Sequence, residues 1–151
     1  MRLTLISPQD TLFEGDILKA TVPTDVGMVT VLPGHVSMGS IVKPGIVSFL
    51  PKEKHTVAFI EGTEFLFKDD EIHLSVSNGS LYVDHENVII LVTEATAKPD
   101  SDIQTLEEIK KNLQKDLEEV KHQWDIHSIE KAYLSLQKIT ADLKLSRMRH
   151  G

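Results

Sequence analysis

Between Pro99 and the final residue, Gly151, this chain contains no glycine or proline. Before Pro99 they punctuate short apolar runs, whereas the segment from Asp100 to His150 contains neither. Because glycine and proline weaken helices and favour turns, the first part is expected to hold strands joined by turns, and the second part is expected to be helical. The chain is therefore expected to hold two structural modules, residues 1–98 and residues 99–151.

The first module is expected to be all-β. Short runs rich in β-branched and aromatic residues alternate with polar residues, and turn sequences such as Lys43-Pro44-Gly45 and Asp69-Asp70 separate them. The expected strands cover residues 2–6, 17–22, 28–32, 46–50, 56–60, 64–67, 72–76, 80–83 and 88–92. Many short strands without a helical pattern between them predict a sandwich or barrel, filled by the alternate apolar side chains.

The second module is expected to form two amphipathic helices packed as an antiparallel hairpin. In each helix, apolar residues recur at steps of three or four, which places them on one face. The first set is Ile103, Leu106, Ile109, Leu113, Leu117, Val120 and Trp124, and the second is Ile129, Ala132, Leu136, Ile139 and Leu143. Ser101 and Gln104 predict a capping box for the first helix, and Asp125 or Ser128 is available to cap the second.

The joint between the two expected helices, from Gln123 to Ser128, contains no residue that forces a turn. Burying one Leu or Ile contributes roughly 1.5 to 3 kcal/mol, whereas ordering each residue costs about 1.5 kcal/mol. A helical pair with so few apolar residues is marginal by itself, so its conformation should depend on the surface that it meets. A static hairpin and a tail that switches conformation are both compatible with this pattern.

Charge and composition exclude several functions. Residues 1–101 carry 14 acidic and 7 basic side chains, and the remainder carries 9 of each. Nucleic acid is therefore a poor partner, because phosphate binding needs a basic face. The chain has no cysteine, which excludes disulfides and fits a reducing compartment. With no signal-peptide pattern and no apolar segment of membrane-spanning length, we expect a soluble protein that reaches a membrane only through partners.

The sequence shows no pattern that predicts catalysis. It lacks a Walker-type loop, G-x-S-x-G and H-E-x-x-H. Its seven histidines never show the paired spacing of a metal site on one element. Acidic pairs such as Glu107-Glu108 are typical of solvated helix faces. We therefore expect no catalytic residue, no cofactor and no metal site in this chain.

A series of short motifs resembles one family. The series is Val22-Pro23-Thr24 with Gly27, then Leu32-Pro33-Gly34-His35, Lys43-Pro44-Gly45 and Asn78-Gly79-Ser80-Leu81-Tyr82-Val83. Each motif is weak alone, but their order and spacing are similar to those of the epsilon subunits of bacterial F-type ATP synthases. The resemblance covers nearly the whole chain. It implies an α+β fold with segregated modules, an N-terminal β-sandwich followed by a C-terminal antiparallel two-helix hairpin.

The resemblance also implies a function. The chain would be a non-catalytic central-stalk subunit of a proton-translocating synthase, bound peripherally on the cytoplasmic face of a bacterial membrane. Its implied partners are the gamma subunit, the c ring and the alpha/beta catalytic head. It would couple the head to the ring, and its C-terminal helices would inhibit ATP hydrolysis.

The resemblance assigns two groups of partner-binding residues. Facing the c ring would be Leu32, Pro33, Gly34 and His35, together with Met28. Meeting an acidic segment of the catalytic head would be Lys144, Arg147 and Arg149. For the three basic residues, a solvated helix end favoured by the helix dipole is an equal alternative.

Departures from the family pattern refine these expectations. Some relatives bind ATP through I/L-D-x-x-R-A, and the matching segment from His127 to Ala132 keeps only the alanine and a positive charge, Lys131. Lysine lacks the planar fork of arginine, so ATP binding is expected to be weak or absent. The segment from Gly27 to Thr30 lacks the acid of the family's G-E-x-G, which predicts a more apolar ring contact. Residues 50–71 are longer than the family needs and are expected to form an extended hairpin.

Two other classes of function remain to be compared with the rotary-motor subunit. One is a free-standing β-sandwich adaptor whose helical hairpin docks an unrelated protein. The other is an enzyme or small-molecule sensor that uses the sandwich. The motif series favours the motor subunit over both.

Overall fold

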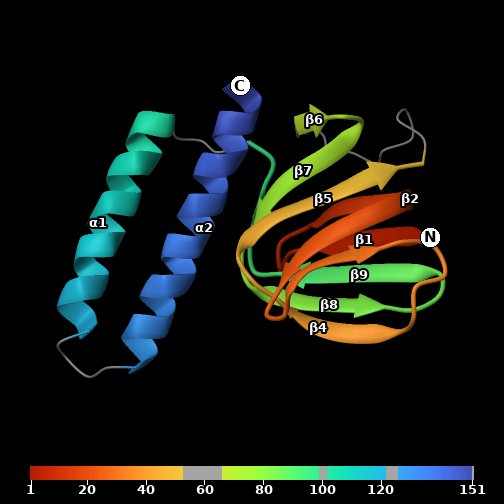
Figure 1. The fold of residues 1–151 in the computed structure, drawn as a ribbon, viewed down its shortest axis with the longest axis horizontal. Helices are drawn as coiled ribbons and strands as arrows, with labels where there is room; N and C mark the ends of the chain where they lie inside the picture. The colour runs from red at the N-terminus through yellow and green to blue at the C-terminus, as the bar shows by residue number, and fades with distance from the viewer. Residues whose placement is uncertain (53–65, 99–101, 122–125, 151) are drawn as a thin grey trace.

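The computed structural model describes residues 1–52, 66–98, 102–121 and 126–150, and it shows a β-sandwich with two helices packed beside it (Figure 1). The expected fold class is confirmed. The strands are β1 (Arg2–Ile6), β2 (Thr11–Thr24), β3 (Gly27–Val31), β4 (Met38–Val42), β5 (Gly45–Pro51), β6 (Leu66–Lys68), β7 (Glu71–Val76), β8 (Gly79–Val83), β9 (Asn87–Val92) and β10 (Ala95–Thr96). The helices are α1 (Ile103–Lys121) and α2 (Ile126–His150).

The long strand β2 joins the two layers of the sandwich. Its first residues pair with β1 as far as Asp16, and from Ile17 to Thr21 it pairs with β5 instead. The full strand order is β1-β9-β8-β4-β2-β5-β7-β10, with β3 paired to β2 and β6 paired to β7. Because β1 also pairs with β2, the sheet curls back on itself and encloses its apolar side chains.

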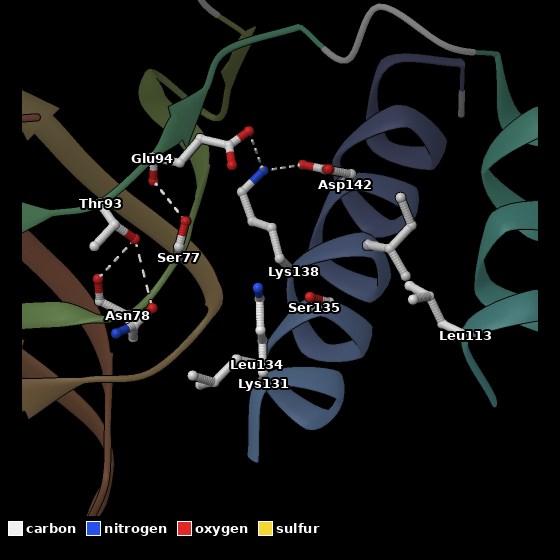
Figure 2. A pocket seen from close by; sticks show the side chains of 11 residues that line it. Ser77, Asn78, Thr93, Glu94, Leu113, Lys131, Leu134, Ser135, Lys138 and Asp142 are labelled. Carbon is white, nitrogen blue, oxygen red and sulfur yellow. Dashed lines mark hydrogen bonds and ion pairs between the residues drawn. The ribbon is translucent and has the colours of Figure 1, made fainter. Parts of the chain in front are cut away.

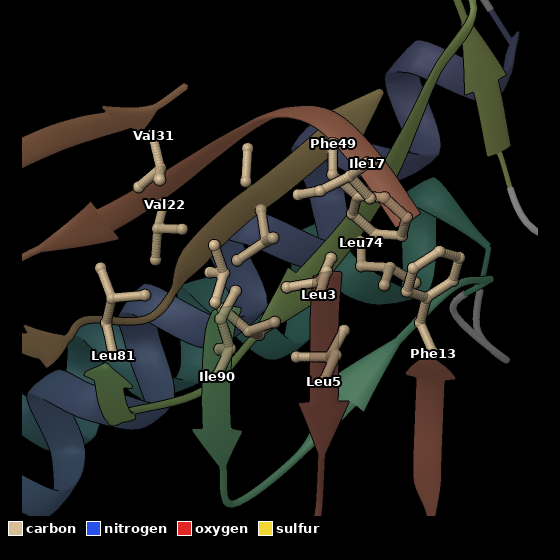
Figure 3. Close-up of a cluster of buried hydrophobic side chains, with 14 of the residues drawn as sticks. Leu3, Leu5, Phe13, Ile17, Val22, Val31, Phe49, Leu74, Leu81 and Ile90 are labelled. Atoms are coloured by element: carbon tan, nitrogen blue, oxygen red, sulfur yellow. The ribbon is translucent and has the colours of Figure 1, made fainter. Parts of the chain in front are cut away.

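The core lies between the layers and takes alternate residues from strands such as β1, β5, β7 and β9 (Figure 3). Leu3 and Leu5 point into it from β1, and Val47 and Phe49 point into it from β5. The rings of Phe13 and Phe49 lie with their centroids 4.4 Å apart. This filling by alternate apolar residues is the one that the sequence pattern predicts.

Most strands lie where the sequence places them. Those expected at 2–6, 28–32, 46–50, 72–76, 80–83 and 88–92 are confirmed to within a residue, and 17–22 is the middle of the longer β2. The strand expected at 56–60 and the start of the one at 64–67 fall outside the described residues. The strand β4 and the short β10 were not expected from the sequence. Gly39 and Ser40 lower the strand propensity of β4, and its pairing with β8 selects the strand.

The turn expected at Asp69-Asp70 is confirmed. Both residues have positive φ, 53° and 68°, and they connect Lys68 to Glu71, which face each other in the β6–β7 ladder. A two-residue hairpin turn with two left-handed residues is the type that matches the twist of antiparallel strands. Of the longer stretch before this turn, residues 53–65 fall outside the described residues.

The start of α1 differs from the expected cap, and one of the two residues expected to cap α2 lies inside that helix. The cap of α1 is Asp102, whose Oδ1 accepts a hydrogen bond of 2.8 Å from the backbone N–H of Thr105. The capping box assigned to Ser101 and Gln104 is therefore wrong by one residue, and Ser101 itself lies outside the described residues. Ser128 lies inside α2 and does not cap it, and Asp125 lies outside the described residues.

The two helices pack against each other in antiparallel directions, and α2 also packs on β5 and β7 (Figure 1). Leu106 and Leu117 of the expected α1 stripe are buried. On α2 the buried apolar residues are Ala141, Leu143 and Leu145, of which only Leu143 belongs to the expected stripe. The difference arises because α2 contacts both α1 and the sandwich, whereas a single apolar stripe can cover only one of these two surfaces.

Neither described helix combines the length and apolar character that crossing a membrane requires.

Candidate functional site

The loop Leu32-Pro33-Gly34-His35 lies at one end of the sandwich. The first residue of β3 and the last of β4 both pair with Thr24, so the loop that connects these strands lies at the opposite end of them. The N–H of His35 donates to the carbonyl of Leu32 at 3.1 Å, and Gly34 has a φ of 84°, a conformation that favours glycine. The turn leaves Leu32 52% exposed and Val36 73% exposed. The loop thus presents an apolar tip.

Met28 lies at the other end of β3 from this loop. It is 60% exposed and lines a cleft of about 530 Å³ between the sandwich and the helices. Pro44 and Ile46 form part of the cleft on the sandwich side, and Lys110 and Lys144 form part of it on the helix side. The structure therefore does not bring Met28 together with Leu32, and it places Met28 near Lys144 instead.

The basic end of α2 is engaged within the chain. Arg147 forms an exposed ion pair of 3.0 Å with Glu107 of α1, and Arg149 donates a hydrogen bond of 2.9 Å to the carbonyl of Ala97. Lys144 is exposed at the cleft. In this conformation two of the three basic residues assigned to an external partner therefore hold the end of α2 to α1 and to the segment after β10.

A row of apolar side chains covers the outer face of the sheet formed by β4, β8, β9 and β1. Ile41, Tyr82 and Leu91 are 59%, 56% and 48% exposed, and Ile6 and Ile89 are half-buried. The ladder registers place Tyr82 opposite Ile89, and Ser80 opposite both Ile41 and Leu91. We call Ile6, Ile41, Tyr82, Ile89 and Leu91 the apolar sheet face.

The apolar sheet face was not expected from the sequence. A signal was present, because residues 88–92 form an unbroken apolar run, Val88-Ile89-Ile90-Leu91-Val92. A strand with one solvated face normally alternates, and a continuous run indicates a strand that is covered on both faces. Val88, Ile90 and Val92 are buried in the core, whereas Ile89 is half-buried and Leu91 is exposed on the outer face.

A polar network joins α2 to the sandwich (Figure 2). The ammonium of Lys138 donates to Oδ1 of Asp142 at 2.7 Å, to the hydroxyl of Thr96 at 3.0 Å and to the hydroxyl of Ser75 at 3.2 Å. The hydroxyl of Ser75 in turn donates to Oδ1 of Asp142. Glu94 adds a longer contact of 3.8 Å to Lys138 and is itself largely exposed.

The alternation of the strands explains why this network lies between the modules. In β7, Ile72, Leu74 and Val76 point into the core, so His73 and Ser75 point to the outer face. Ile46 of β5 lies opposite Ser75 and shares that outer face, on which α2 packs. The side chains of Lys138 and Asp142 are only 10% and 14% exposed, so the ion pair is largely removed from water.

Within the described ranges no group of three or more His, Asp or Glu residues is arranged to hold a metal ion. Asp84 has its pKa held below its usual range by hydrogen bonds from the backbone N–H groups of Glu86 and Asn87. These bonds close the β8–β9 turn, so the lowered pKa reflects a structural role rather than acid–base chemistry.

The fold is therefore that of a β-sandwich protein with an exposed apolar sheet face and a two-helix hairpin docked beside it. Residues 1–98 match the family model described as ATP synthase, Delta/Epsilon chain, beta-sandwich domain. The chain belongs to the ATP synthase epsilon chain family, which confirms the resemblance seen in the sequence.

Curated relatives named ATP synthase epsilon chain match different shares of the chain. The protein of Maricaulis maris is 34% identical over 62 residues, which are 41% of this chain and 47% of that protein. The protein of Leptospira interrogans is 29% identical over 70% of this chain and 85% of its own length. The protein of Dichelobacter nodosus is 25% identical over 97% of this chain and 93% of its own length.

Solved structures share the fold. A chain of the Euglena gracilis mitochondrial ATP synthase, from a structure of its OSCP, F1 and c-ring, superposes with a TM-score of 0.67 at 19% identity, covering 96% of this chain and 79% of that one. A chain from the central stalk and c-ring of the Tetrahymena thermophila enzyme gives a TM-score of 0.53 at 11% identity, covering all of this chain and 96% of that one.

Proposed function

We propose that this chain is a non-catalytic subunit of the central stalk of a proton-translocating ATP synthase, and that it couples the catalytic head to the c ring. In this proposal residues 1–98 form the stalk and ring-contacting domain, and residues 99–151 form a mobile regulatory tail. The observation that carries the proposal is the family match over the whole sandwich. The complex would hold the chain peripherally on the cytoplasmic face of a bacterial membrane.

The apolar sheet face is our candidate surface for the gamma subunit. Ile41, Tyr82 and Leu91 lie on neighbouring strands, and the ladder rows that join them contain no charged residue on β4, β8, β9 or β1. Exposed apolar patches on soluble proteins mark interaction sites, and depletion of charge is typical of the centre of an interface. A stalk subunit fixed to a shaft needs a broad contact of this kind.

The apolar loop tip at Leu32 is our candidate contact for the c ring, as the resemblance implies. It lies at the end of β3 remote from the cleft between sandwich and helices. The sheet face lies along β4, β8 and β9, whereas the loop tip lies in the connection between β3 and β4, so one sandwich can bind gamma and the ring at the same time. Met28 belongs to the cleft in the docked conformation, so we assign the ring contact to Leu32, Pro33, Gly34 and His35 alone.

We also propose that the helical tail inhibits ATP hydrolysis when it leaves the sandwich. Arg147 and Arg149 would then exchange Glu107 and the carbonyl of Ala97 for acidic groups of the catalytic head. The Arg147 pair is exposed on both sides, and exposed pairs contribute little to stability and weaken with salt. The Arg147 pair can therefore be exchanged at low cost.

The proposal is tested by purifying the tagged full chain from gently solubilised native membranes and counting the subunits that accompany it. One copy with three alpha, three beta, one gamma and a c ring is the expected result. Recovery of the chain alone, or with unrelated proteins, would contradict the proposal and favour the β-sandwich adaptor.

The regulatory part has its own test. Deleting residues 100–151 should raise ATP hydrolysis by the assembled enzyme without changing its subunit composition. Unchanged hydrolysis in a normally assembled enzyme would show that the tail is structural.

ATP binding by the isolated chain should be weak or absent. Lys131 supplies a charge at the position where the binding motif of some relatives has arginine, but it cannot form the planar two-point contact to phosphate. Isothermal titration calorimetry should show no heat of binding at micromolar ATP. A clear micromolar affinity would refute the expectation.

A further inference from the structure

We propose that the Lys138–Asp142 ion pair is a reversible latch, carried on α2, which docks the helical hairpin on the hydroxyls of Ser75 and Thr96. The four residues come from three elements that are distant in the sequence, β7, β10 and α2. Lys138 reaches all three of the others within 3.2 Å. We call these four residues the Lys138 latch.

The donors of the Lys138 ammonium all find acceptors within the Lys138 latch. An ammonium group has three N–H donors, and Asp142, Thr96 and Ser75 supply three acceptors. Ser75 is completely buried, and its hydroxyl finds an acceptor in Asp142. Removing any one partner leaves a buried polar group without a bond, which is more costly than never having buried it.

The ion pair does not depend on docking. Lys138 and Asp142 are four residues apart on α2, so they remain neighbours when the hairpin leaves the sandwich. Docking therefore creates no new pair of charges, and it moves an existing pair out of water. Burying an ion pair has a desolvation cost that can exceed its Coulombic gain.

What compensates this cost is the pair of hydroxyls on the sandwich. Only the docked state lets Lys138 donate to Ser75 and Thr96, because both lie on strands. The outer face beneath α2 alternates in polarity, with Ile46 opposite Ser75 and Ser48 opposite His73. Because this surface is polar at every second position, the hydroxyls add to the apolar contacts of α2 in setting the balance between docked and released states.

The test measures the hairpin position in the isolated full chain. The chain has no cysteine, so spin labels can be attached to cysteines introduced at the exposed residues Ser80 and Glu130, and pulsed EPR then reports the distance between sandwich and α2. Native-state hydrogen exchange at the amides of β7 and β10 detects release when the released state is too rare for EPR.

The variants separate the roles of the latch residues. Lys138→Met and the double variant Ser75→Ala with Thr96→Val should each raise the released-to-docked ratio roughly tenfold or more. Lys131→Met, which removes an exposed lysine of the same helix, should leave the ratio unchanged. Lys138→Met combined with Asp142→Leu removes both charges and should restore docking at least to the original level.

Two results would overturn the latch. The first is a Lys138→Met distance distribution and exchange pattern equal to those of Lys131→Met. The second is a released-to-docked ratio of the charge-free double variant that equals the ratio of Lys138→Met alone. Desolvation of the ion pair would then not limit docking.

The effect of the latch on the assembled enzyme rests on the proposed function. There the Lys138→Met variant should inhibit hydrolysis more strongly than the original chain does. The charge-free double variant should inhibit hydrolysis less than Lys138→Met does. If the distances respond as expected and hydrolysis does not, the inhibitory function fails while the latch stands.

Discussion

At the scale of single residues, Asp102 shows how one carboxylate sets a helix boundary. Its hydrogen bond from the N–H of Thr105 holds the pKa of the carboxyl below its usual range. A carboxylate at a helix start is stabilised by the unpaired N–H groups there and by the helix dipole. Ser101 offers only a neutral hydroxyl, which explains why the helix begins one residue later than the capping box implies.

The lowered pKa of Asp102 predicts a pH dependence. Because the folded pKa lies below the unfolded one, the stabilisation by the charged cap is fully present above the ordinary aspartate range and is lost as the pH falls through the folded value. Asp102→Ala should lower the melting temperature at pH 7, and its difference from the original chain should shrink toward about pH 3. Circular dichroism melts at both pH values check this, with Asp102→Asn as a neutral cap whose effect should vary less with pH.

Position 79 can be occupied only by glycine. A Cβ atom at this position would lie 1.8 Å from the carbonyl oxygen of Leu91 on the neighbouring strand. Gly79→Ala should therefore force β8 and β9 apart and lower the stability by about 2 kcal/mol. Gly39→Ala is the control, because a Cβ there meets only the carbonyl of Leu81 at 3.8 Å. Similar urea midpoints for the two variants would contradict the prediction.

At the scale of elements, α1 depends on a few buried side chains. Leu106 is 3% exposed and Ile109, on the same expected stripe, is 37% exposed. Leu106→Ala should cost about 2 to 3 kcal/mol and increase hydrogen exchange throughout residues 103–121, whereas Ile109→Ala should cost clearly less. Equal effects of the two substitutions would mean that α1 packs through a different face.

Local sequence patterns predicted the helices and strands better than the contacts between them. Alternation and turn residues are properties of neighbouring positions, so strands such as β5 and turns such as Asp69-Asp70 could be read directly. The change of partner within β2, and the separation of Met28 from Leu32 by the length of β3, depend on pairing between distant segments. Lys138 gave no local signal either, because its partners Ser75 and Thr96 lie more than 40 positions away.

At the scale of the whole molecule, the sandwich presents separate surfaces for separate partners. Placing a charge in the apolar sheet face should prevent assembly without unfolding the chain, since Ile41 and Tyr82 contribute little to the core. Ile41→Asp and Tyr82→Asp should each reduce the recovery of ATP synthase subunits with the tagged chain by about tenfold, while the melting temperature stays close to the original.

A charge change on α1 provides the control for the apolar sheet face. Lys111→Asp alters an exposed residue on another element and should leave assembly intact. Normal recovery with Tyr82→Asp would exclude this face from the assembled enzyme and would require another surface to bind gamma.

The internal contacts of Arg147 and Arg149 compete with any contact of these residues to an outside partner. A guanidinium that holds Glu107 or the carbonyl of Ala97 is not free for an outside carboxylate, so docking and partner binding exclude each other at these residues. The apparent affinity of the tail for any acidic partner is then its intrinsic affinity multiplied by the released fraction. Every substitution that shifts the released fraction should change partner affinity by the same factor, even far from the partner, and the sandwich thereby sets the threshold at which the tail responds.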